Sequence, residues 1–139
     1  MSRDGTVRAV SCRMRAASLE ELQVYQKALS VAHEVSALLK RSCFRRDLRL
    51  YDQLAASSDA CASLISDGFA QSTDRFFAQL CYRSKGEAKE TRTHLIIAKG
   101  RDYITESELD ALCAKYEEIE RMLTSLIHYL ERSDWKRRG

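Results

Sequence analysis

The amino-acid sequence predicts an all-α protein, folded as an antiparallel up-down-up-down four-helix bundle. Three observations support this prediction. Apolar residues recur at alternating intervals of three and four along four segments, the joints between these segments are short, and the 139 residues include no proline. Proline removes a backbone donor and clashes with the preceding turn, so its absence leaves long helices uninterrupted. Short joints between long helices favour antiparallel neighbours.

The first helix is expected over about residues 19–41. Ser18 and Glu21 have the spacing of a capping box, in which each side chain accepts a hydrogen bond from the backbone N–H of the other. Two apolar rows follow, and together they make a face wider than one bundle seam requires. The second row, which also includes Ala28, therefore predicts an oligomer interface formed by Val24, Val31, Val35 and Leu38.

The second and third helices are expected over about residues 46–67 and 73–99. The seams of both contain many small residues, which allows the two backbones to approach closely. Gly86 lies inside the third helix, where glycine lowers helix stability by about 1 kcal/mol relative to alanine. Its presence therefore indicates close packing there. Gly68 and Gly100 fall where these helices should stop, because glycine readily adopts the left-handed conformation of a C-terminal cap.

The fourth helix, expected over about residues 106–131, has the clearest pattern. Thr105 and Glu108 form a second capping box. An unbroken alternation of three and four then runs to Leu130, which is the seam of helices packed at roughly 20°. Outside the bundle we expect a basic flexible N-terminal tail, residues 1–17, and a basic C-terminal tail, residues 132–139. Each segment has a net charge of +3.

The composition fits one soluble domain, with 45% hydrophobic and 31% charged residues. No run approaches the roughly 20 apolar residues of a membrane-spanning helix, and the N-terminus lacks the apolar block of a secretion signal. These features predict a cytoplasmic protein with no membrane contact. The five cysteines have no paired spacing, which argues against a disulfide framework or a zinc knuckle. Three of them fall on or beside core stripes as small apolar residues: Cys61, Cys81 and Cys113.

The sequence lacks the usual catalytic and metal-binding patterns. Di-iron bundles need two Glu-x-x-His motifs, whereas Glu90 and His94 are four residues apart and have no second copy. His33, His94 and His128 lie on different predicted helices; they could converge on a metal ion, although isolated histidines at a helix boundary are commoner. No phosphate-binding loop or nucleophile elbow occurs. We therefore predict no enzymatic activity, catalytic residue, cofactor, metal or small-molecule substrate.

Charge is distributed unevenly along the chain. Residues 40–49 and 83–101 each carry a net charge of +4, whereas residues 106–131 carry −5. The basic segments could neutralise nucleic-acid phosphates. Opposite flanks could instead dock copies head-to-tail into a ring, or facing helices could exchange surface salt bridges. The candidate nucleic-acid contacts are Arg45, Arg46, Arg49, Lys85, Lys89 and Arg92.

A set of short motifs resembles a known family. The motifs are L-x-V-Y-Q-K-A-L at 22–29, D-G-F at 67–69, F-F-x-x-L at 76–80, K-G-E-A-K-E at 85–90, L-I-I-A-K at 95–99 and Y-I-T-E-S-E-L-D at 103–110. In order and spacing they resemble the bacterial four-helix-bundle proteins encoded in 23S rRNA intervening sequences. The resemblance covers about residues 19–130.

The resemblance implies an antiparallel bundle that assembles into a homopentameric ring and has no established enzymatic activity. A related branch, the accessory proteins of diversity-generating retroelements, forms similar barrels that engage nucleic acid and a reverse transcriptase. The chain departs from the family where Ala62 and Leu64 replace a proline and an asparagine. In the third helix, residues 84–87 stand in place of the family's Ala-Arg-Gly-Ser, and Glu90 matches its downstream glutamate.

Three functional interpretations follow. In the first, a non-enzymatic homo-oligomer, a pentamer by the resemblance, associates with RNA or DNA through Lys85, Lys89, Arg92 and residues 40–49. In the second, the oligomer is a scaffold whose partner is a protein, and its basic residues serve subunit contacts. The wide apolar face of the first helix favours the second interpretation. An enzyme or a metal protein is a third interpretation, which no residue pattern supports.

Overall fold

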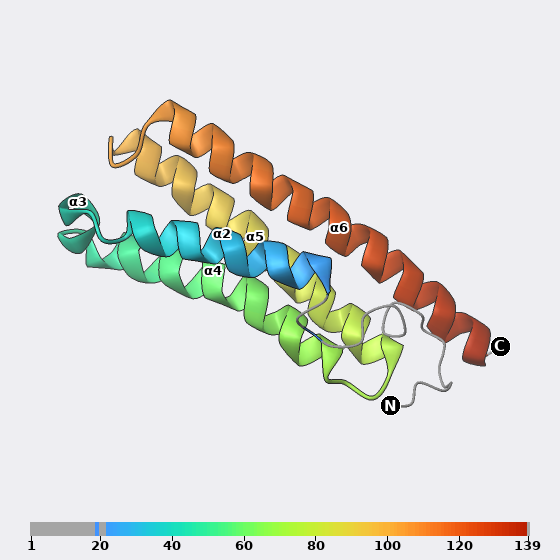
Figure 1. The fold of residues 1–139 in the computed structure, drawn as a ribbon. Coiled ribbons are helices and arrows are strands. Elements are labelled where there is room, and N and C mark those ends of the chain that lie inside the picture. The colour runs from blue at the N-terminus through green and yellow to red at the C-terminus, as the bar shows by residue number, and fades with distance from the viewer. Residues whose placement is uncertain (1–18, 20–21, 139) are drawn as a thin grey trace.

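The computed structural model describes residue 19 and residues 22–138, with side chains up to residue 133. These residues contain no strand. They form four long helices and a short one, labelled as in Figure 1: α2 (Gln23–Leu38), α3 (Ser42–Arg45), α4 (Leu48–Phe69), α5 (Asp74–Gly100) and α6 (Glu106–Arg138). None of these helices has the length and apolar character that crossing a bilayer requires.

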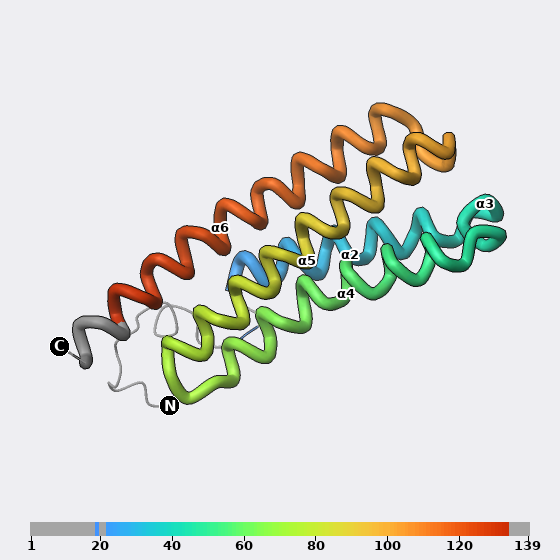
Figure 2. The backbone as a smooth tube through the Cα atoms, turned by 180° about the vertical axis from the view of Figure 1, so that it is seen from behind, coloured from blue at the N-terminus to red at the C-terminus, as the bar shows by residue number. Residues whose placement is uncertain are grey.

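The long helices pack along one another as an all-helical bundle. Figure 1 shows the chain reversing direction at each joint, and Figure 2 shows the same arrangement from behind. Helix α5 contacts both α4 and α6, and α2 also contacts both. The short helix α3 lies at the end of the bundle where α2 passes to α4, near the joint between α5 and α6.

The first and last helices differ from the expected ones at their outer ends. Helix α2 begins at Gln23, and its N-cap residue Leu22 provides no side-chain cap. Helix α6 continues to Arg138, so residues 132–138, expected as a tail, extend the last helix. The expected N-terminal tail and the first capping box lie outside the described residues, namely residues 1–17, Ser18 and Glu21.

Two side-chain caps fix the beginnings of α4 and α6. The predicted box at α6 is confirmed: Thr105 N donates to Glu108 Oε1 (2.9 Å), and Glu108 N donates to Thr105 Oγ1 (3.1 Å). Helix α4 begins at Leu48, after an N-cap residue, Asp47, whose Oδ1 accepts from Leu50 N (3.3 Å). The short helix before this cap, α3, has no counterpart among the predicted elements.

The apolar row assigned to an oligomer interface lies inside the chain's own core, so that prediction is wrong. Val24, Val31, Val35 and Leu38 are 4%, 1%, 0% and 9% exposed. Helix α2 faces α4 and α6, and this row is buried between them. The other row is buried at Leu22, Ala32 and Leu39 and half-buried at Tyr25. The four predicted interface residues therefore stabilise the single chain and offer no surface to a partner.

Helices α4 and α5 approach closely, as their small seam residues predict. Ser84 Oγ on α5 donates to the backbone oxygen of Cys61 on α4 (2.6 Å), and Thr91 Oγ1 is hydrogen-bonded to Ser57 Oγ at 2.8 Å. A serine hydroxyl can reach the backbone of a neighbouring helix only where no large side chain separates the two. All four residues are buried, and Cys81 is buried as expected.

The described glycines have different surroundings. A Cβ on Gly68 would lie 2.7 Å from Phe77 Cδ1, so this glycine makes room for a core ring. A Cβ on Gly86 or Gly100 would meet nothing within 4 Å, so the expected close packing of Gly86 within the chain is wrong. Neither Gly68 nor Gly100 is left-handed. Asp102, with φ of 61°, occupies the left-handed position after α5 instead.

Candidate nucleic-acid interface

The end of the bundle at α3 is built by contacts between the joint that precedes α4 and the joint that precedes α6. Phe44 on α3 is fully buried, and its ring meets the Tyr103 ring edge-on, with centroids 5.2 Å apart. The backbone oxygen of Tyr103 accepts from Arg41 Nη1 (3.0 Å). A helix of four residues is too short to be stable alone, so burial of Phe44 against this distant joint holds α3 in place.

Asp47 ties the same two joints together. Its Oδ2 accepts from Arg101 Nη1 (2.7 Å) and from the hydroxyl of Tyr103 (2.9 Å). The hydrogen bond from Tyr103, together with the Arg101 guanidinium, lowers the pKa of the Asp47 carboxyl. The same hydrogen bond raises the pKa of Tyr103. The negative charge of Asp47 is therefore matched by Arg101.

Arg41 and Glu108 form a second ion pair at this end. Arg41 Nη1 donates to Glu108 Oε1 (3.0 Å), and Nη2 donates to Oε2 in a shorter hydrogen bond. These hydrogen bonds, with one from the backbone N–H of Thr105, lower the pKa of Glu108 to about 2. Bidentate, charge-assisted contacts of this kind are stronger than ordinary hydrogen bonds. The pair joins the end of α2 to the beginning of α6.

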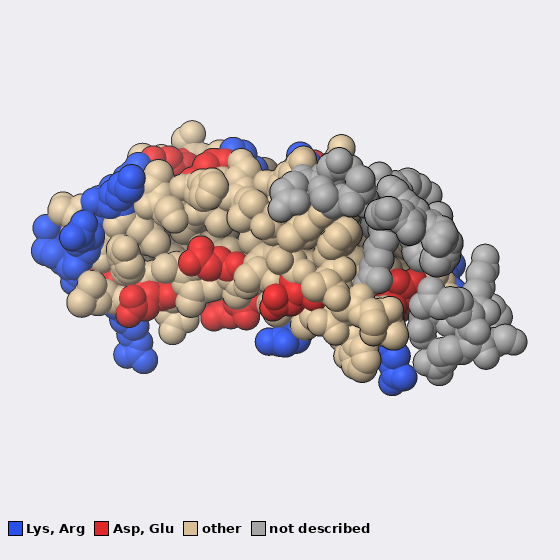
Figure 3. Space-filling model, turned by 60° about the horizontal axis from the view of Figure 1, so that its bottom comes forward, with Lys and Arg blue, Asp and Glu red and all other residues tan. Residues whose placement is uncertain are grey.

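Asp47 and Glu108 already bind Arg101 and Arg41. The four other cations at this end therefore have no carboxylate as an ion-pair partner among the described residues. They are exposed, and none forms an ion pair within the described part of the chain. We call these four residues the basic joint: Lys40, Arg45, Arg46 and Arg49. Figure 3 shows Lys and Arg side chains gathered at the end of the molecule where α3 lies.

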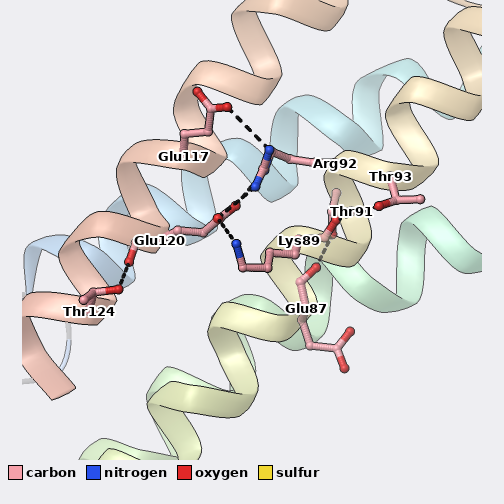
Figure 4. Close-up of polar contacts among 8 residues, drawn as sticks. All are labelled: Glu87, Lys89, Thr91, Arg92, Thr93, Glu117, Glu120 and Thr124. Atoms are coloured by element: carbon pink, nitrogen blue, oxygen red, sulfur yellow. Dashed lines mark hydrogen bonds and ion pairs between the residues drawn. The ribbon is translucent and has the colours of Figure 1, made fainter.

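The three candidate cations on α5 lie elsewhere, and two of them are already paired. Arg92 binds Glu120 on α6 through two hydrogen bonds, from Nε to Oε2 (2.7 Å) and from Nη2 to Oε1 (2.9 Å). Lys89 Nζ donates to the same carboxylate (3.0 Å). Figure 4 shows both side chains pointing from α5 toward Glu120. Lys85 lines an open groove between these helices, so the six candidates fall in two separate places.

Glu120 explains why Lys89 and Arg92 point toward α6. Its side chain is nearly buried, and burial alone would raise its pKa, but the hydrogen bonds from Arg92 and Lys89 outweigh burial and lower it. A buried carboxylate that loses its partner is strongly destabilising. Glu117 adds a longer contact, 3.4 Å from Arg92 Nη1. Part of the opposite charge on α5 and α6 is thus neutralised within one chain, as the salt-bridge interpretation expects.

Sequence reasoning missed Glu120. One signal is present, because Glu120 follows Ile119 of the α6 seam, and positions flanking a seam often carry interhelical salt bridges. Its partner is not readable from spacing, since Arg92 lies 28 residues away on another helix. For the basic joint, the structure shows exposure and free charge, and its contact with nucleic acid stays a prediction.

No three side chains of His, Cys, Asp or Glu come together as a metal site within the described ranges. His33 on α2 and His128 on α6 are exposed, and His94 on α5 is half-buried. Burial raises the pKa of the Cys61 thiol to about 11, which keeps it protonated in the core. Cys113 is only half-buried, although it was assigned to the core with Cys61 and Cys81.

Comparisons with known proteins bear on both fold and family. The sequence model for the 23S rRNA-intervening sequence protein matches residues 20–125. A crystal structure of a protein of unknown function from the S23 ribosomal protein family of Bacteroides thetaiotaomicron VPI-5482 is 22% identical, with a TM-score of 0.70. The match covers 75% of this chain and 97% of that one, and it shows the fold alone. No curated protein matches. Because the family match spans most of the sequence, the chain belongs to the 23S rRNA-intervening sequence protein family.

Proposed function

We propose that this chain is a non-enzymatic, cytoplasmic homo-oligomer that associates with RNA or DNA through the basic joint. Its subunit is an antiparallel up-down-up-down bundle of four long helices. The pentameric ring of the proposal comes from the family resemblance, and family membership supports it. The proposed nucleic-acid contact comes from the charges of this chain.

One observation carries the proposal: the basic joint presents four exposed cations that no carboxylate of the described chain neutralises. Guanidinium groups stay charged and bind phosphate oxygens through two N–H donors. A phosphate can therefore bind Arg45, Arg46 or Arg49 without displacing a partner. Lys89 and Arg92 would first have to release Glu120, which makes the α5 cations the weaker candidates.

The test is a titration of labelled single-stranded and duplex RNA and DNA, read by fluorescence anisotropy over a salt series that starts at about 50 mM. We expect binding at the lowest salt, with log affinity falling linearly as log salt rises, because phosphate contacts release counterions. The variant Arg45→Ala/Arg46→Ala/Arg49→Ala is expected to bind at least about tenfold more weakly, with a salt slope smaller by about 2–3.

A matched control removes three exposed cations from other helices, in Lys27→Ala/Lys115→Ala/Arg121→Ala. This control has the same change in net charge, and we expect it to keep the wild-type affinity and slope. Three results would contradict the role of the basic joint: no binding at about 50 mM salt, binding that does not respond to salt, or equal losses in the two triple variants.

A protein-interaction scaffold without nucleic-acid binding is the second candidate. A different observation favours it, because α5 exposes four large apolar side chains: Phe76, Tyr82, Ile96 and Ile97. Light scattering tests the assembly that both candidates share, and a pentamer has five times the 15.9 kDa chain mass. A strict monomer at micromolar concentration removes the ring. A stable assembly that binds no nucleic acid at low salt supports the scaffold.

A further inference from the structure

Gly86 has no evident structural role within its own chain. It lies in the middle of α5, where glycine is among the poorest helix formers, yet a Cβ built on it meets nothing within 4 Å. Its backbone has no positive φ that would require glycine. An alanine would fit at this position and favour the helix. The missing side chain therefore points to a close neighbour outside the chain.

Helix α5 also exposes large apolar side chains, two of which lie on the line of Gly86. Phe76, Tyr82, Ile96 and Ile97 are 51%, 52%, 55% and 36% exposed, and only one other large apolar residue in the described chain, Leu48, is exposed as well. Phe76, Gly86 and Ile97 belong to one line of positions that alternates by three and four: 76, 79, 83, 86, 90, 93 and 97. All seven positions are exposed, so this line faces away from the core.

The neighbouring outward face of α4 has a complementary character. It exposes two small side chains, Ala56 and Ser63, and three acids, Asp52, Asp59 and Asp67. None of these acids forms an ion pair with a described residue. Figure 3 brings the α4 side of the molecule forward and shows Asp and Glu side chains spaced along it among uncharged surface.

We propose that the outward face of α5 packs antiparallel on the outward face of α4 in a second copy of this chain, with Gly86 opposite Ala56. Two cations on α5, Arg75 and Arg83, are exposed and have no ion pair in the described chain. Counted from Gly86, they lie 11 and 3 residues away. Counted from Ala56, acids lie at the same intervals in the opposite direction: Asp67 and Asp59.

This alignment brings two small residues together and gives both free α5 arginines an acidic partner. Arg83 meets Asp59, Arg75 meets Asp67, and the two smallest residues meet at the centre, where backbones can approach closely. Phe76 and Ile97 lie toward the two ends of the same line on α5, and Arg83 and Glu90 lie next to its centre. A second copy fits this surface better than a nucleic acid does, because the acids of α4 repel phosphates and attract the α5 cations.

The inference rests on the proposed assembly and names the surfaces that form it. Gly86→Leu places a large side chain where the second helix must approach, and leucine favours the α5 helix. We expect the dissociation constant of the assembly, measured by light scattering or sedimentation over a concentration series, to rise at least about tenfold. Gly100→Leu is the matched control, because it lies on the same helix in equally open space but beyond the α4 contact. We expect no change in mass for it.

Charge exchange tests the register of the two helices. Arg83→Glu and Asp59→Arg are each expected to weaken assembly by about two- to fivefold, and the double variant is expected to restore it. The alignment also places Glu90 opposite Asp52, a repulsive pair. Glu90→Lys is therefore expected to strengthen assembly by a similar factor, a gain that general damage to the fold cannot produce.

The possible outcomes distinguish a failure of the proposed assembly from a wrong assignment of the surface that forms it. A wild-type chain that stays monomeric contradicts the proposed assembly itself. If wild type assembles and Gly86→Leu, folded by circular dichroism, keeps the same mass, the assembly stands and the assignment of this surface is overturned. If Gly86→Leu loses nucleic-acid binding without a change in mass, the surface belongs to nucleic acid, and the inference is overturned as well.

Discussion

Replacing Glu108 by glutamine tests how the end of the bundle that carries the basic joint is held. Glu108→Gln keeps an oxygen that can accept from Thr105 N but removes the charge that Arg41 binds. The pKa of Glu108 is about 2 in the folded chain, against an ordinary value of 4.5, which corresponds to about 3 kcal/mol. A third of the side chain is exposed, so solvent screening reduces the expected loss in the free energy of unfolding to about 1–2 kcal/mol.

The lowered pKa also fixes how this stabilisation depends on pH. The folded chain binds the Glu108 proton more weakly than the unfolded chain does. The stabilisation is therefore fully present above about pH 4.5 and is lost as the pH falls through about 2. Wild type and Glu108→Gln are expected to differ at neutral pH and to converge in strong acid.

Urea unfolding followed by circular dichroism, at one protein concentration and several pH values, measures the difference. Glu106→Gln is the control, because Glu106 is exposed and its Oε1 lies 3.7 Å from Lys99 Nζ. We expect this control to change the free energy of unfolding by less than about 0.5 kcal/mol. Equal stability of wild type and Glu108→Gln at neutral pH, or an undiminished difference near pH 2, would refute the role assigned to the Arg41–Glu108 pair.

Three further substitutions test other contacts by thermal or urea unfolding. Gly68→Ala is expected to lower the free energy of unfolding by about 1–2 kcal/mol, because the added methyl would lie 2.7 Å from Phe77 Cδ1; an unchanged value would mean that this ring moves freely. Asp102→Gly is expected to raise it by up to about 1 kcal/mol, because Asp102 has φ of 61°; a loss would contradict strain there. Glu120→Ala is expected to lower it by about 2–3 kcal/mol, because Arg92 loses its carboxylate, and a neutral result would refute that contact.

Local patterns predicted the long helices, and failed where long-range contacts decide the structure. The alternation of three and four residues marks α4, α5 and α6, and the capping box at Thr105 and Glu108 forms as expected. Helix α3 has no periodic signal, because one buried residue, Phe44, holds it against Tyr103 from a distant joint. The two apolar rows of α2 show the same limit. Periodicity reveals that both exist, but only the positions of α4 and α6 decide that the row of Val31 faces the core.

The candidate site, too, was predictable from the sequence only in part. Runs of charge in the sequence correctly mark where cations gather, since Arg45, Arg46 and Arg49 are exposed as one group. They do not show which cations are free, because pairing depends on residues far along the chain. Lys89 and Arg92 are bound by a carboxylate 31 and 28 residues away, and that contact removes them from the strongest candidates. Only the three-dimensional structure therefore shows which cations have no ion-pair partner.

The two proposals concern different surfaces, and the antiparallel alignment connects them. In each chain α4 and α5 run in opposite directions, as Figure 1 shows. When α5 of one copy packs antiparallel on α4 of the next, both copies point the same way. The basic joints of all copies then lie at one end of the assembly, and Gly86 lies in the contacts between copies. A nucleic acid that reaches two joints is bound more tightly than either joint binds alone, and it releases more counterions, so the salt dependence of the assembly is steeper than that of a single chain.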